Sequence, residues 1–216
     1  MPEMFVFSDV ICPWCYLGKR RLERALDETG LRGALRLRWL PFELNPDMPE
    51  DGMPRAEYRA RKFGPERSAE LDARMQALGA EEGVTFAFDR MARTPNTRRA
   101  HLLIAYAGRR DRDEALAEAL FHAYFEDGKD IGDPSVLAEI GRAQGLPADE
   151  IAAALSSDEL RGEVVALERR AAEMGIGGVP FFILEGGRGV SGAQPAEEWK
   201  PLLMSLHAGP RAQPSG

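Results

Sequence analysis

The chain has only two cysteines, Cys12 and Cys15, and they stand two residues apart near its N-terminus. They follow the apolar run Phe5 to Phe7 after one short turn, and they open a segment in which leucines recur at helical spacing. Two cysteines one helical turn apart lie within bridging distance of each other. The pair therefore requires a strand, a tight turn and a helix in immediate succession, which few folds provide.

The flanking residues predict a β-α-β unit. The bulky run 5–7 favours a strand buried on both faces of a parallel or mixed sheet. Pro13 is typical of a first helical turn, and the helix that it opens is expected to end near Gly30. Apolar and charged residues alternate over 35–39, as in a strand with one solvated face.

The rest of the chain alternates between helical and strand patterns. Residues 55–155 are dominated by helical spacing and good helix formers, with few β-branched residues. A further helix is predicted over 160–174, two short strands near 181–184 and Val190, and a last helix after Pro195. The order is β-α-β, a long helical stretch, helix, β-β, helix, which indicates an α/β protein.

The net charge and the hydropathy of the chain limit the classes of partner and the cellular location that we expect. The net charge of -7 disfavours nucleic acid or an anionic membrane surface as the main partner. No apolar run approaches the ~20 residues that span a bilayer, and the first residues do not resemble a secretory signal. We therefore expect a cytoplasmic protein.

The cysteine pair predicts thiol–disulfide chemistry. A thiolate attacks a disulfide, and the free N–H groups and dipole at a helix N-terminus favour negative charge there. Cys12 is the predicted nucleophile, and Cys15 is the partner that resolves the mixed disulfide. Pro13 would stiffen the turn, and Trp14 offers a broad surface for substrate.

A proline near the second strand pair adds to this prediction. Val179-Pro180 directly precedes the apolar run 181–184, where a proline cannot donate to the strand ladder. X-Pro bonds are the ones in which the cis form is accessible, so this bond is a candidate cis peptide. In cis, the Val179 backbone would face the sulfurs and could pair with an extended substrate.

Half of a zinc site is a rival interpretation of Cys-x-x-Cys. It would need two more ligands, drawn from acidic residues or from His101, His122 and His207. The sequence has no second Cys-x-x-Cys and no closely spaced histidine pair, so no metal is expected.

Five segments together resemble the DsbA-like thioredoxin-fold oxidoreductases, in particular their FrnE-type branch, which is related to hydroxychromene-carboxylate isomerases and kappa-class glutathione transferases. The segments are FSDVICPWCYLGKRRLE at 7–23, PFELNPDMP at 41–49, NTRRAH at 96–101, GVPFFI at 178–183 and VSGAQP at 190–195. The resemblance implies a thioredoxin-like fold with a large all-helical insertion. The thioredoxin-like domain would comprise 1–54 and 157–208, the insertion 55–156, and a flexible tail 209–216.

The resemblance also implies site residues. Cys12 occupies the family's nucleophile position and Pro180 its cis-proline position. His101, Asn45 and Gln194 resemble substrate-binding positions of relatives. The isomerase and transferase branches typically carry serine where this chain has Cys12, which favours dithiol–disulfide exchange here.

Three functions follow as hypotheses. The leading one is a thiol–disulfide oxidoreductase acting on a protein or small-molecule thiol or disulfide, with no tightly bound cofactor and with glutathione or another low-molecular-weight thiol as a co-substrate. The second is a glutathione-dependent isomerase or transferase acting on an aromatic small molecule. The third is a non-catalytic peptide-binding holdase, for which Trp14 and Tyr16 would supply apolar surface.

Overall fold

The computed structural model describes residues 1–207 and is built around a four-stranded mixed sheet in the order β2-β1-β5-β6. The helix α1 joins two parallel strands, β1 and β2, while β5 pairs antiparallel with β1 and β6 pairs antiparallel with β5. These elements are β1 (Glu3–Ser8), α1 (Pro13–Glu28), β2 (Arg36–Pro41), β5 (Phe181–Ile183) and β6 (Gly189–Ser191). The predicted β-α-β unit and mixed sheet are confirmed, and the predicted tail 209–216 lies outside the described residues.

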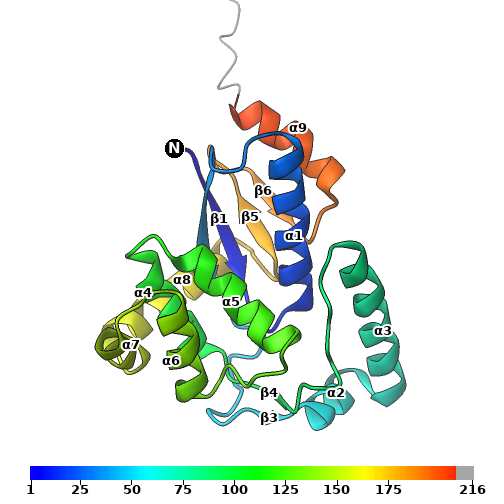
Figure 1. The fold of residues 1–216 in the computed structure, drawn as a ribbon, viewed down its shortest axis with the longest axis vertical. Helices are drawn as coiled ribbons and strands as arrows, with labels where there is room; N and C mark the ends of the chain where they lie inside the picture. The colour runs from blue at the N-terminus through cyan, green and yellow to red at the C-terminus, as the bar shows by residue number, and fades with distance from the viewer. Residues whose placement is uncertain (208–216) are drawn as a thin grey trace, which may run out of the picture.

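Helices cover the two faces of the sheet unequally. On one face α1 packs beside α9 (Ala196–His207), and Trp199 meets Phe182 edge to face at 4.7 Å (Figure 1). On the other face the C-terminal part of α8 (Asp158–Glu173) lies over Phe7. Phe5 projects to that same face and is 38% exposed, so the predicted burial of this strand on both faces is wrong at Phe5. The reason is that α8 covers this face only around Phe7.

The stretch between β2 and α8 is largely helical, as predicted. Its helices are α2 (Arg55–Phe63), α3 (Pro65–Glu81), α4 (Arg98–Gly108), α5 (Asp113–Phe125), α6 (Pro134–Ala143) and α7 (Ala148–Leu155). We keep 55–156 as the proposed bounds of the insertion, since these helices all lie within them.

The insertion is not entirely helical. The two-residue strand β4 (Arg93–Thr94) pairs antiparallel with β3 (Met53–Pro54), at the foot of the molecule in Figure 1. A β-branched residue followed by proline, Thr94-Pro95, favours extended backbone here. Gly52 has a φ of +64°, and a Cβ at this position would lie 2.5 Å from the Thr94 carbonyl oxygen. Only glycine fits both conditions.

A continuous apolar core connects the sheet to the insertion. Tyr16 on α1 stacks on Phe121 of α5 at 5.1 Å, and Trp39 of β2 meets the same ring at 5.8 Å. On the other side of α1, helices α2 and α3 lie near its first turn (Figure 1). The Cys-x-x-Cys turn is therefore held where the sheet, α1 and the insertion meet.

Candidate active site

Cys12 is the residue that precedes α1, and its backbone is extended, with φ -89° and ψ 111°. Its amide N–H donates to the Asp9 carbonyl oxygen at 2.9 Å, and its own carbonyl oxygen accepts from the Cys15 N–H at 3.0 Å. These bonds place the Cys12 side chain at the free N-terminal end of the helix, with Pro13 as the first helical residue. The predicted position of the first cysteine is therefore observed.

Cys15 lies behind Cys12 inside the protein. It is 1% exposed, and both cysteines are free thiols. Burial raises the pKa of the Cys15 thiol, the hydrogen bond and charge of Cys12 raise it further, and Ser8 opposes the shift. The two sulfurs are thus in contact but unequal, because Cys12 borders the cavity described below and Cys15 does not.

The loop before β5 closes over Cys12. The Val179-Pro180 peptide bond is cis, and the Val179 carbonyl oxygen lies 3.7 Å from the Cys12 Sγ, which donates to it. Pro180 packs on α1 at Gly18, where a Cβ would stand 3.0 Å from the proline Cγ. Absence of a side chain at Gly18 lets this loop approach the helix that carries the cysteines.

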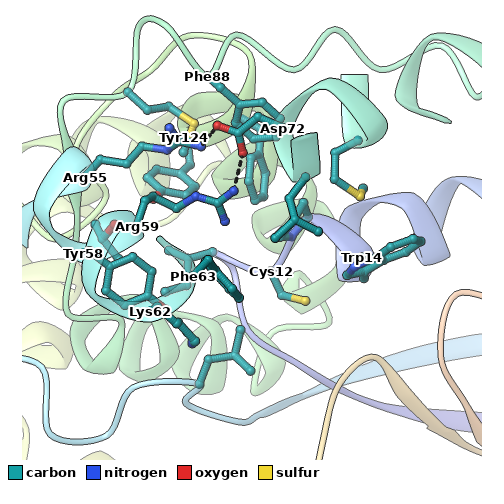
Figure 2. Close-up of a pocket in the computed structure, with 18 of the residues that line it drawn as sticks. Cys12, Trp14, Arg55, Tyr58, Arg59, Lys62, Phe63, Asp72, Phe88 and Tyr124 are labelled. Atoms are coloured by element: carbon teal, nitrogen blue, oxygen red, sulfur yellow. Dashed lines mark hydrogen bonds and ion pairs between the residues drawn. The ribbon is translucent and has the colours of Figure 1, made fainter. Parts of the chain in front are cut away.

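A cavity of about 350 Å³ opens beside Cys12 (Figure 2). Of the predicted site residues, its walls contain Cys12, Pro13, Trp14 and Val179. The remaining lining residues come mainly from α2, α3, the segment 88–94 and α5, and aromatic and basic side chains are prominent among them beside aliphatic ones and one acid, Asp72. They include Arg55, Tyr58, Arg59, Lys62, Phe63, Asp72, Arg74, Phe88 and Tyr124.

The other predicted substrate-binding residues do not line this cavity. Pro180 is buried behind Val179. Asn45 lies next to the cavity wall, where its Oδ1 accepts from the Tyr58 hydroxyl at 2.9 Å and the Lys62 ammonium at 3.3 Å. Gln194 donates to the Ser191 carbonyl oxygen at 2.7 Å.

His101 is 2% exposed and lies beneath the cysteine turn. Its Nε2 is 3.5 Å from Oδ1 of Asp9, a fully buried carboxylate that accepts from the Leu44 N–H at 2.7 Å and the Ile11 N–H at 3.4 Å. Burial lowers the pKa of His101, but the adjacent Asp9 and the charges of Glu43 and Glu168 outweigh this effect, so that the pKa is raised. Asp9 therefore ties the turn that carries Cys12 to the loop after β2 and to α4.

A second buried ion pair adjoins this one. Arg98 on α4 binds the carboxylate of Glu43 and lies 3.5 Å from that of Glu168 on α8. Burial and the charge of Glu43 raise the pKa of Glu168. The floor of the site is thus a network of charged groups drawn from four separate segments.

The sequence alone identifies neither the buried acid Asp9 nor the basic wall of the cavity, which consists of Arg55, Arg59, Lys62 and Arg74. The only available signal for Asp9 was an acidic residue inside an otherwise apolar stretch, three positions before Cys12. Arg55, Arg59 and Asp72 follow the ordinary charge pattern of solvated helices, so nothing in the sequence distinguishes them. They become site residues only because α2 and α3 fold against the first turn of α1.

Two kinds of feature are absent from residues 1–207. Within that range the side chains of His, Cys, Asp and Glu form no group of three or more suited to a metal ion. None of the described helices combines the length and apolar character needed to cross a membrane.

Comparison with known proteins agrees with this geometry. Residues 4–203 match the DSBA-like thioredoxin domain family. The crystal structure of a probable DsbA oxidoreductase, SCO1869 from Streptomyces coelicolor, is 34% identical, with a TM-score of 0.87 over 100% of this chain and 94% of that one. The uncharacterized protein YwbO of Bacillus subtilis is 25% identical over 83% of this chain and 84% of its own.

More distant solved structures share the fold. The cytosolic disulfide reductase DsbM of Pseudomonas aeruginosa, solved with GSH, is 21% identical, with a TM-score of 0.67 over 95% of this chain and 99% of that one. A 2-hydroxychromene-2-carboxylate isomerase is 18% identical, with a TM-score of 0.71 over 95% of each chain.

The fold and the cysteine turn define a protein of the thioredoxin-like class. The chain belongs to the family of DsbA-like thioredoxin domains. The predicted resemblance to DsbA-like proteins and the fold class are confirmed, and the family supports thiol–disulfide oxidoreductase chemistry in general.

Proposed function

We propose that this protein exchanges thiols and disulfides through Cys12 and Cys15. The observation that carries the proposal is the asymmetry of the pair. Cys12 Sγ borders the cavity and touches the Val179 carbonyl, whereas Cys15 is buried behind it with a raised pKa. An accessible first sulfur and a protected second one are what sequential attack and resolution require.

The reaction proceeds in two displacements. The Cys12 thiolate attacks one sulfur of a substrate disulfide, forms a mixed disulfide and releases the first thiolate. Cys15 then loses its proton and attacks Cys12 Sγ, which releases the second thiolate and leaves a Cys12–Cys15 disulfide. The substrate gains two electrons and the enzyme loses two, and an external thiol such as glutathione restores the dithiol.

Two cysteine variants test these roles. Cys15→Ser is expected to accumulate the mixed disulfide between Cys12 and substrate, because the resolving thiol is missing, and intact-protein mass spectrometry detects that adduct. Cys12→Ser is expected to form no adduct and to lose exchange in a single turnover. Full exchange by Cys12→Ser would refute the assignment.

The proposal also covers the cellular location of the protein and its co-substrate. DsbM is described as cytosolic and was solved with GSH, and its fold covers 95% of this chain. We therefore propose a cytoplasmic enzyme that uses no tightly bound cofactor and takes glutathione or another small thiol as its co-substrate.

A second candidate is glutathione-dependent isomerisation or transfer on an aromatic molecule. The aromatic cavity beside Cys12 favours it, and so does the shared fold with the isomerase. This chemistry needs one sulfur only, so activity on an aromatic substrate panel should survive Cys15→Ser. Dependence on Cys15 would exclude it.

A further inference from the structure

We propose that the cavity beside Cys12 selects small disulfides and thiols that carry a carboxylate, in preference to neutral or cationic ones. This rests on the proposed exchange function and names its substrate class. Four cations and one carboxylate stand among the lining residues: Arg55, Arg59, Lys62, Arg74 and Asp72. The cavity that Cys12 borders therefore carries an excess of positive charge.

The two partly buried arginines share a single acid. Arg55 and Arg59 each hold a different oxygen of Asp72 at 2.7 Å, and the three side chains are 16%, 17% and 21% exposed (Figure 2). The Nε of Arg59 is buried and has no hydrogen-bond partner within residues 1–207. One carboxylate cannot neutralise two guanidinium groups, so this wall stays positive.

The other two cations have no acidic partner at all within the described part of the chain. Lys62 donates to the Tyr58 hydroxyl at 2.6 Å and lies 5.1 Å and 5.8 Å from the ring centres of Tyr58 and Phe63. Arg74 lies 5.6 Å from the ring centre of Trp14. Figure 2 shows Cys12 between Trp14 and the α2 side chains Lys62 and Phe63. Charged groups on aromatic faces thus flank the sulfur and are free to bind an anion.

Size and net charge support the same substrate class. A cavity of about 350 Å³ suits a small molecule. The chain as a whole carries a charge of -7, so the cavity is a positively charged region on a protein that is negative overall. A charged cleft raises the local concentration of counter-ions and their association rate. Anionic substrates should therefore gain in second-order rate at low ionic strength.

Three symmetrical disulfides with similar carbon chains test the proposal. They are 3,3'-dithiodipropionate, 2-hydroxyethyl disulfide and cystamine, which are anionic, neutral and cationic. The rate of oxidation of the reduced protein is followed by thiol alkylation, and each rate is divided by that of free 2-mercaptoethanol to remove intrinsic reactivity. We expect the normalised anion rate to exceed the cation rate by about tenfold or more at low salt, and this ratio to shrink in 0.5 M salt.

Variants inside and outside the cavity test whether the cavity side chains produce the selectivity. Lys62→Gln and Arg74→Gln, both at exposed positions, should each lower the ratio of anionic to neutral rate. Arg188→Gln removes an exposed cation from the turn between β5 and β6, outside the cavity, and should leave that ratio unchanged. Equal normalised rates for the three disulfides, or unchanged ratios in both cavity variants, would overturn the proposal. Failure of all three disulfides to oxidise Cys12 would instead refute the exchange function itself.

Discussion

At the scale of single residues, the two cysteines differ in access, and the pKa of Cys15 is raised. Both are nearly buried, but only Cys12 lines the cavity, and burial raises the pKa of Cys15. Iodoacetamide at neutral pH should therefore modify Cys12 first in the reduced protein, as peptide mass spectrometry would detect. In 6 M guanidinium chloride, which removes this environment, the two should react alike. Faster labelling of Cys15 in the native protein would contradict the assigned roles.

The Asp9–His101 pair should make stability depend on pH. The pKa of His101 is raised above its ordinary 6.5, so the pair's contribution to folding is complete below about pH 6.5 and is lost as pH rises through the raised value. Urea unfolding of the wild type should show this decline, and His101→Gln should remove it.

The pKa of Glu168 is also raised, above its ordinary value of 4.5. Ionisation of Glu168 therefore lowers the stability of the folded protein as the pH rises from about 4.5 upward. This effect is present in both the wild type and His101→Gln, but the His101 charge lowers the pKa of Glu168. The difference between the two proteins therefore reports His101 together with its coupling to Glu168. The His101 imidazole followed by NMR provides an independent check. A midpoint at or below 6.5 would contradict the ion pair with Asp9.

At the scale of elements, contact between α1 and the Pro180 loop holds the site together. A Cβ at Gly18 would meet Pro180 at 3.0 Å and the Ala193 backbone at 3.3 Å. Gly18→Val should therefore overpack this contact, cost about 1–3 kcal/mol of unfolding free energy and slow disulfide exchange.

Gly162 on α8 provides the matched control, because a Cβ there meets nothing within 4 Å. Gly162→Ala should stabilise the protein by about 0.4–1 kcal/mol and leave exchange unchanged. Urea unfolding and the single-turnover assay measure both effects. A Gly18→Val protein as stable and as fast as the wild type would show that the contact does not matter.

Local patterns predicted the elements near the cysteines well. The alternation over 35–39 and the proline at position 13 are short-range signals, and β2 and α1 form where these signals indicate them. The β3–β4 ladder was missed because its two strands are two residues long and lie about forty positions apart. The basic wall was missed for a related reason, since only packing decides which charged helix face meets Cys12.

At the scale of the whole molecule, a partly buried charge cluster joins α1 to the insertion. Lys19, which is 2% exposed, lies 2.8 Å from Glu118 of α5, and Arg20 binds the same carboxylate. Tyr16 donates to Glu126 at 2.6 Å just beyond it. This cluster fixes the insertion against the helix that carries Cys12 and Cys15.

Removing the shared carboxylate should weaken that connection. Glu118→Gln leaves Lys19 with Glu23 as its remaining acidic partner in the described chain, and it should cost about 1–3 kcal/mol of unfolding free energy. Glu163→Gln breaks an exposed pair with Arg109 and should cost less than about 1 kcal/mol. Equal losses in the two variants, measured by urea unfolding, would show that the cluster is no stronger than a surface pair.

The central claim is that Cys12 and Cys15 form one redox couple, and titration against defined ratios of reduced and oxidised glutathione tests it most directly. The fraction of free thiol is read by alkylation and mass spectrometry. We predict a single two-electron transition, with a tenfold change in the equilibrium constant for each ~30 mV, and a Cys12–Cys15 disulfide as the oxidised product. A midpoint near or above the cytosolic glutathione poise of ~-220 to -320 mV would indicate an oxidising or isomerising enzyme, and one well below it a reductase. If no Cys12–Cys15 disulfide formed at any ratio, the account of this protein as a dithiol enzyme would be wrong.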